Sequence, residues 1–151
     1  MAVHSKNKQL QQVEIAISVE KQPYLIEFVP CLCQITKNAK FSQCAIGITK
    51  QEILLYSDME PNRIVDNVYF YNAFATLPIS EVVTFVKSEI RRNEELRNFI
   101  RLDIFMKDVS QSKILYFPKN DKLRLTKFLK AAKQAKIKIV KNIMNYNLGS
   151  C

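Results

Sequence analysis

The residues of this chain that could do chemistry are few, and their spacing does not assemble a catalytic or metal site. His4 is the only histidine, so histidine-dependent triads and proton shuttles are set aside. The cysteines show no CxxC pair, which leaves a zinc site without its usual ligands; they are Cys31, Cys33, Cys44 and Cys151. We therefore expect no metal, no cofactor and no enzymatic activity.

Other catalytic patterns are missing as well. The chain has two glycines and contains neither GxxxxGK[ST] nor GxGxxG, the loops that usually cradle nucleotide phosphates. Glu94 and Glu95 are adjacent, so their carboxylates point in different directions and do not form an acid–base pair. Cys44 shares a strand face with Ile46 and Ile48, and we expect a buried structural thiol there rather than a nucleophile. A binding role is favoured over catalysis.

Positive charge is concentrated near the C-terminus. The net charge of the chain is +9, and the segment Lys113–Lys141 alone holds ten basic residues against one acid, Asp121. A positive face of this kind attracts phosphates or acidic surfaces. The alternative interpretation is a solvated helix whose lysines only keep the protein soluble, because lysine is a good helix former on any exposed face.

The periodicity of this basic segment predicts one amphipathic helix between Pro118 and Lys136. At about 100° per residue, its apolar residues fall on one side; they are Leu125, Phe128, Leu129, Ala132 and Ala135. Pro118 ends the preceding segment, and Asn120 or Asp121 can cap the helix. The opposite side carries the candidate residues for binding an anionic surface, which are Lys122, Lys127, Lys130 and Lys133.

The rest of the chain predicts short strands in a single domain over residues 13–140, between a polar leader (1–12) and a tail (141–151). The segment Phe99–Lys107 alternates strictly, with Ile100, Leu102, Ile104 and Met106 inward. The segments 43–49 and 52–57 predict a hairpin across Lys50 and Gln51. We expect a mainly β fold, a barrel or two-sheet sandwich of about seven antiparallel strands, closed by one C-terminal helix.

Two further expectations concern backbone and location. Pro30 lies inside the apolar segment 24–35, which indicates an edge position or a bulge because proline cannot donate to a strand ladder.

No apolar run approaches the ~20 residues that a bilayer-spanning helix needs, and residues 1–12 lack the apolar core of a secretion signal. These observations predict a cytoplasmic protein.

The order of these elements resembles the pleckstrin-homology-like (PH-like) superfamily, in particular bacterial PH and GRAM-type domains. The hairpin Ala45–Tyr56 looks like the family's "apolar–Thr–Lys–x–x–apolar–Tyr" hairpin, and Leu77–Val83 is similar to its "I-x-x-V" strand entry. A final hairpin then leads into the closing helix. The resemblance covers residues 13–140 and implies a PH-like binding scaffold.

Two family features differ in this chain. Lipid-binding members carry a basic cluster on the first hairpin, whereas residues 13–28 here contain Lys21 among Glu14, Glu20 and Glu27. The tryptophan common in the closing helix of eukaryotic members is absent, since the chain has none. The resemblance therefore implies a scaffold whose usual ligand site is not matched.

Together these patterns predict a non-catalytic binding module that engages an anionic surface through its basic helix. The surface is either membrane lipid headgroups or an acidic protein partner. The alternative is a nucleic-acid-binding protein that uses the same lysine face through phosphate contacts, with strong salt dependence and little sequence preference. The sequence leaves these possibilities open.

Overall fold

The computed structural model describes residues 13–18, 27–34, 40–57, 63–66 and 68–144. The expected leader, including His4, and the C-terminal Cys151 lie outside these residues. One α-helix is described, α2 (Lys122–Gln134). The strands are β1 (Val13–Ser18), β2 (Glu27–Cys33), β3 (Ser42–Ile48), β4 (Glu52–Tyr56), β5 (Arg63–Val65), β6 (Val68–Pro78), β7 (Val82–Ile90), β8 (Phe99–Met106), β9 (Lys113–Pro118) and β10 (Ile139–Met144).

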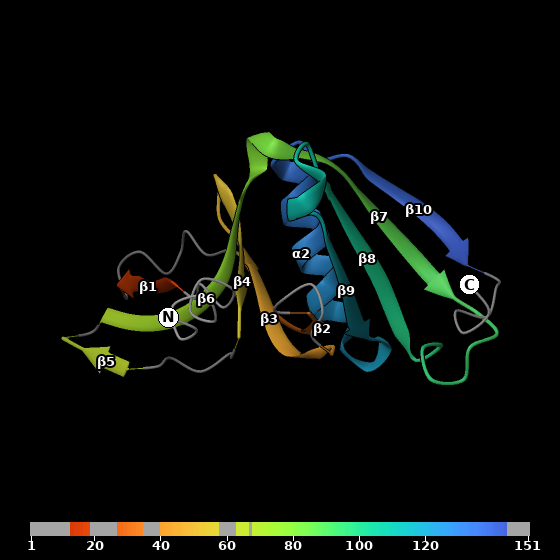
Figure 1. Cartoon of the computed structure of the whole chain (residues 1–151), viewed down its shortest axis with the longest axis horizontal. Helices are drawn as coiled ribbons and strands as arrows, with labels where there is room; N and C mark the ends of the chain where they lie inside the picture. Colours follow the sequence, from red (N-terminus) through yellow and green to blue (C-terminus); the bar gives the residue numbers. More distant parts are fainter. Residues whose placement is uncertain (1–12, 19–26, 35–39, 58–62, 67, 145–151) are drawn as a thin grey trace, which may run out of the picture.

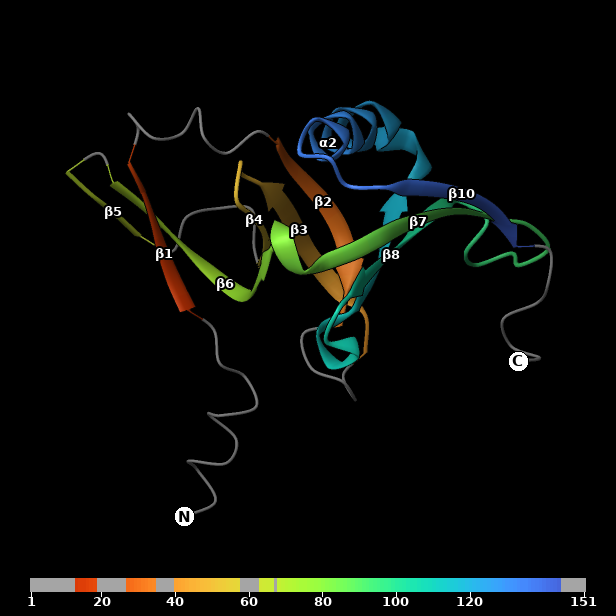
Figure 2. The ribbon, with the colours of Figure 1, turned by 90° about the horizontal axis from the view of Figure 1, so that it is seen from above.

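All of these strands belong to one sheet, in the order β1-β6-β4-β3-β2-β9-β8-β7-β10, with β5 paired to β6 (Figure 1). The helix α2 packs on one face of this sheet, against β2, β3 and β9. The strands β1 and β5 lie at one end of the sheet, away from α2 (Figure 2). The predicted mainly β fold with one C-terminal helix is confirmed, although the described part of the chain holds ten strands rather than about seven.

The alternation in β8 and the turn between β3 and β4 are as predicted. Every second residue of β8 is buried in the main core; these residues are Ile100, Leu102, Ile104 and Met106. At the turn, the backbone N–H of Thr49 donates to the carbonyl of Glu52 at 2.9 Å. The hydroxyl of Thr49 accepts from the backbone N–H groups of Gln51 at 3.2 Å and Glu52 at 3.1 Å. This side-chain oxygen fixes the reversal without a glycine.

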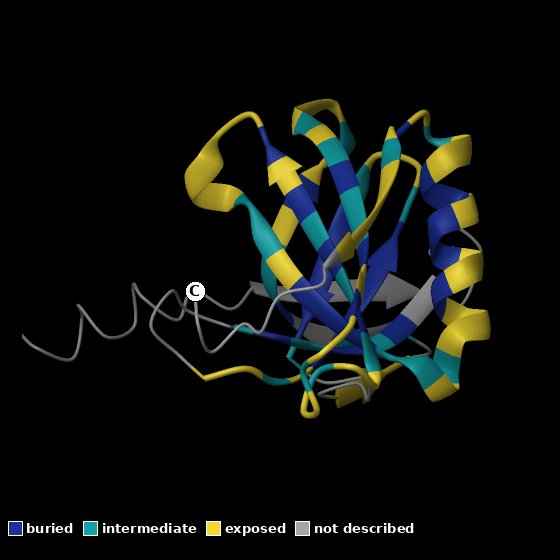
Figure 3. Cartoon of the chain, turned by 90° about the vertical axis from the view of Figure 1, so that its right-hand side faces the viewer, coloured by how far each residue is buried: buried dark blue, intermediate teal, exposed yellow. Residues whose placement is uncertain are grey.

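The helix α2 buries its predicted apolar side against the sheet and exposes the opposite side (Figure 3). The ring of Phe128, which is fully buried, stacks on Phe85 of β7 with centroids 6.2 Å apart and planes 8° apart. Asp121 occupies the N-cap position, but its side chain makes no capping hydrogen bond. Its carboxylate instead lies 3.7 Å from the guanidinium Nε of Arg124.

The strand β2 explains how Pro30 is accommodated. This strand pairs with β3 along its whole length, yet it pairs with β9 only at Leu32 and Cys33. At Pro30 the strand therefore has a partner on one side only, so no ladder hydrogen bond is lost to the missing N–H. The strand β2 is thus an inner strand and not the edge strand that the sequence predicted, although Pro30 itself has no partner on the β9 side.

The chain after α2 corrects the expected tail boundary. The helix ends in a Schellman motif, in which the N–H of Ile137 donates to Ala132 O at 3.0 Å and that of Lys136 to Lys133 O at 2.9 Å. Lys136 adopts φ 66°, which turns the chain back along the sheet. Residues 139–144 then pair in parallel with β7 as β10. Residues 141–144 are thus part of the sheet, because they cover the edge of β7 that β8 leaves free.

Candidate anion-binding groove

The strand β7 changes character halfway along its helix-facing side. Side chains two residues apart share a face of a strand, so Phe85, Lys87 and Glu89 all lie on the side where α2 packs. Phe85 is fully buried under Phe128. Lys87 and Glu89 lie farther along, where they line a groove with a volume of about 810 Å³ between the start of α2 and the end of the sheet.

The register of β10 brings a second lysine to this groove. In the parallel pair, Lys141 is the direct partner of Lys87, and Ile143 is the partner of Glu89. The pairing begins where the Lys138 carbonyl accepts from the Phe85 N–H at 2.9 Å and from the Thr84 hydroxyl at 3.0 Å. These bonds fix the register and therefore place two lysines side by side on one face.

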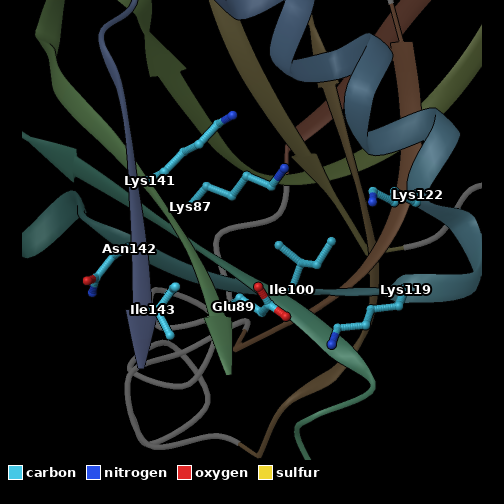
Figure 4. Close-up of a pocket in the computed structure, with 8 residues that line it drawn as sticks. All are labelled: Lys87, Glu89, Ile100, Lys119, Lys122, Lys141, Asn142 and Ile143. Atoms are coloured by element: carbon cyan, nitrogen blue, oxygen red, sulfur yellow. The ribbon is translucent and has the colours of Figure 1, made fainter. Parts of the chain in front are cut away.

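The other wall of the groove is the turn that leads into α2. It contributes Lys119, from the 3₁₀ turn Lys119–Asp121, and Lys122, the first residue of α2 (Figure 4). Ile100 of β8 and Ile143 of β10 supply the apolar part of the lining. We call this site the basic groove and its cations the groove lysines, which are Lys87, Lys119, Lys122 and Lys141.

The single acid of the basic groove, Glu89, only partly offsets the repulsion among the groove lysines. Partial burial lowers the pKa of Lys87 from its ordinary value, and the charges of Lys141, Lys122 and Lys133 lower it further, while Glu89 acts in the opposite direction. Like charges at paired positions of adjacent strands are destabilising. Glu89 lies beside Arg91, with 3.8 Å between the carboxylate and the guanidinium, and both side chains are about half exposed. The groove therefore keeps a strong positive potential.

The structure divides the four lysines predicted from the helix. Lys122 lines the basic groove, and the charge of Lys133 acts on Lys87. These two residues are eleven positions apart, which brings them to within about 20° of the same side of the helix. Lys127 and Lys130 are exposed and do not line the groove; we call them the outer pair.

The sequence did not indicate the site residues that lie on the sheet, Lys87 of β7 and Lys141 of β10. Lys119 and Lys141 lie within the basic segment, where no pattern distinguishes them from the other lysines, and Lys87 lies in a separate strand far from that segment. The one local signal is the alternation Phe85, Lys87, Glu89, which places two charged residues on the same face as an apolar one. Their partner Lys141 follows only from the parallel pairing with β10.

The three described cysteines have the structural role that was predicted for Cys44. Cys31, Cys33 and Cys44 are all buried, and Cys31 faces Cys44 across the β2–β3 pair. Burial raises the pKa of all three thiols, that of Cys33 to about 12, which keeps them protonated and poorly nucleophilic. Among the residues that the structure describes, no three His, Cys, Asp or Glu side chains gather as ligands for a metal ion.

Comparisons with known proteins find similarity among solved structures but no matching family. No protein-family model and no curated protein matches the chain. In the described part of the chain, no helix has the length and apolar character needed to cross a bilayer. Among solved structures, the chain is similar to the hSac2 domain from human phosphoinositide phosphatase Sac2, with 13% identity, a TM-score of 0.40, and coverage of 97% of this chain and 87% of that one. This degree of likeness assigns neither family nor activity to the chain.

Proposed function

We propose that this protein is a non-catalytic, PH-like binding module that holds the anionic groups of a membrane surface at its basic groove. One observation carries the proposal: lysines from β7, β10 and the turn before α2 converge on one concave site that contains a single carboxylate, Glu89. A solvated helix whose lysines serve only solubility has no reason to be joined by lysines from two strands.

The energetic cost of the arrangement supports a binding role. Lys87 and Lys141 repel each other at paired positions, and Lys87 is also partly buried. Natural proteins keep such locally unfavourable features mainly at functional sites, where a ligand relieves them. An anion between the two ammonium groups would replace the repulsion with charge-assisted hydrogen bonds.

The outer pair extends the same surface. Lys127 and Lys130 are exposed on α2, and each lysine near an anionic bilayer contributes on the order of 1 kcal/mol through long-range attraction. In this proposal the outer pair draws the protein towards the surface, and the groove lysines make the close contacts. A nucleic acid or an acidic protein would be attracted by the outer pair in the same way. Any preference among these three kinds of ligand must therefore come from the basic groove.

The test is co-sedimentation of the full chain with vesicles of phosphatidylcholine and phosphatidylserine at physiological salt, using three charge-matched double variants. Lys122→Glu/Lys141→Glu alters the groove, Lys127→Glu/Lys130→Glu alters the outer pair, and Lys40→Glu/Lys107→Glu alters exposed lysines outside both. Two lysines at roughly 1 kcal/mol each correspond to a loss of about 30-fold in affinity, and the groove variant should lose more than this because it also removes close charge-assisted contacts. The outer variant should lose less, and the third variant least.

Two outcomes would contradict the proposal. Equal losses for all three variants would mean that net charge, and not the groove, determines binding. Pelleting that an added DNA duplex abolishes, with duplex binding that falls steeply as salt rises, would support the nucleic-acid alternative instead.

A further inference from the structure

The donors of the basic groove approach a bound group from different directions. Lys87 and Lys141 rise from adjacent strands, whereas Lys119 and Lys122 extend from the opposite wall (Figure 4). A terminal phosphate has three free acceptor oxygens, so it can accept from the two strands and from the wall at once. A phosphodiester has two free oxygens, because its other two carry carbon substituents.

The charge of the groove favours a dianion over a monoanion. Four lysines and one glutamate line it, a local balance of +3. A phosphate monoester carries close to two negative charges at pH 7, since its second pKa is about 6. A diester or a carboxylate carries one, and would leave more of the repulsion between Lys87 and Lys141 uncompensated.

The type of donor and the size of the groove indicate the rest of the ligand. All of its cations are lysines, which bind phosphate as point charges. Its volume of about 810 Å³ exceeds what a phosphate alone fills and lies in the usual range for small-molecule sites. Ile100 and Ile143 offer an apolar wall for a carbon skeleton.

We infer that the basic groove selects a phosphate monoester, a terminal phosphate on a carbon skeleton, over phosphodiesters and carboxylates. This inference rests on the proposed function and names the ligand class of the same site. Lys87 is its central residue, because it lies between Lys141 on β10 and Leu102 on β8, and because its charge interacts with that of Lys122 on the opposite wall. The same phosphate chemistry is present in a free glycerol phosphate and in a lipid headgroup.

The first test is calorimetric titration of the full chain with glycerol 3-phosphate, dimethyl phosphate and acetate at low salt. We expect glycerol 3-phosphate to bind about tenfold or more tightly than dimethyl phosphate, the ratio that one additional charge-assisted hydrogen bond gives. Its affinity should rise between about pH 5 and pH 7 as the second phosphate proton leaves. Equal affinity for the monoester and the diester would overturn the inference.

The second test assigns the preference to Lys87. Lys87→Gln should reduce the preference for the monoester to about threefold or less. The phosphate would then lose the donor on β7 and keep those on β10 and on the opposite wall. Lys141→Gln should act in the same direction, and it guards against misfolding of either single variant. Lys107→Gln, which removes the same charge from an exposed site outside the groove, should retain the preference. A preference that survives both groove substitutions would overturn the assignment.

A third test separates the two sources of the phosphate and separates this inference from the proposed function. Vesicles with phosphatidic acid, a monoester, are compared with vesicles that carry phosphatidylglycerol, a diester, at equal surface charge. Stronger pelleting with phosphatidic acid supports a lipid monoester. Binding of glycerol 3-phosphate without pelleting supports a free monoester and contradicts the membrane proposal. Equal pelleting with both lipids contradicts the monoester inference and leaves the membrane proposal standing.

Discussion

The helix-facing side of the sheet has two regions, one covered by α2 and one left open beside it. In the covered region, β2, β3 and β9 present apolar side chains to the buried side of the helix. In the open region, β7 and β10 present Lys87 and Lys141 on the same face. The strand β7 crosses from one region to the other within two residues, from Phe85 to Lys87. The position of the helix therefore determines which residues of a strand are core and which form a site.

A second contrast separates the lysines themselves. The outer pair and Lys122 belong to the same helix and the same run of positive charge, yet only Lys122 meets lysines from other elements. Positive charge along one helix creates a general attraction for anions. A site with a preferred ligand requires donors that converge from several directions, which the parallel β7–β10 pair supplies.

The largest change in stability should come from Phe128→Ala, which removes a buried side chain from the covered region. This side chain is fully buried and stacks on Phe85, so its removal should lower the free energy of unfolding by about 3–5 kcal/mol. Urea denaturation of the purified protein measures the change through the transition midpoint. The matched control is Leu123→Ala on the same helix, which is 69% exposed and should change stability by less than about 0.5 kcal/mol. Similar losses for the two variants would mean that α2 is not anchored through its buried side.

A smaller effect of opposite sign should follow from Lys87→Met in the open region. The methionine keeps the length of the side chain but removes both the burial of a charge and the repulsion from Lys141. We expect stability at pH 7 to increase by on the order of 0.5 kcal/mol while the affinity for anions falls. Lys127→Met is the control. Lys127 is exposed on the helix, so its replacement relieves neither the burial of a charge nor the repulsion from Lys141, and it should not increase stability.

The dependence of this gain on pH follows from the lowered pKa of Lys87. The penalty of the charged lysine is fully present below its folded pKa, where folded and unfolded states are both protonated. As the pH rises towards 10.5, the ordinary pKa of a lysine, the folded state loses its proton first, so the unmodified protein gains stability relative to Lys87→Met. The advantage of the variant should therefore shrink in alkaline solution. An advantage that stayed constant up to pH 10.5 would mean that the charge of Lys87 is not its source.

The sequence predicted the elements whose information is local. The period of two in β8, the hairpin between β3 and β4, and the apolar stripe of α2 depend on neighbouring residues, and all three are confirmed. The basic groove depends on a pairing between residues 87 and 141, which are far apart in the chain. Neither residue is marked as a site residue by its neighbours in the sequence. Lys87 follows a β-branched run, and Lys141 lies in a segment that is predicted to be a tail. Register across a parallel crossover is therefore what sequence patterns could not supply.

The sequence also does not indicate where the helix ends. Glycine is the usual residue after a helix that ends in a Schellman motif, because the position requires positive φ. This chain has Lys136 there, with φ 66°, and so the sequence shows no stop signal. The turn nevertheless determines where β10 begins and therefore where Lys141 lies.

The smallest predicted effect tests this turn with Lys136→Gly. Glycine relieves the left-handed backbone strain but adds freedom to the unfolded chain, so the net gain in stability should be on the order of 0.5 kcal/mol. Because the register of β10 stays the same, the affinity of the groove for phosphate should not change. Lys138→Gly is the matched control, since Lys138 is not among the residues with positive φ and the same substitution there should lower stability by about 0.5–1 kcal/mol. If both substitutions lowered stability equally in urea denaturation, the strain at Lys136 would be excluded as a source of the expected gain.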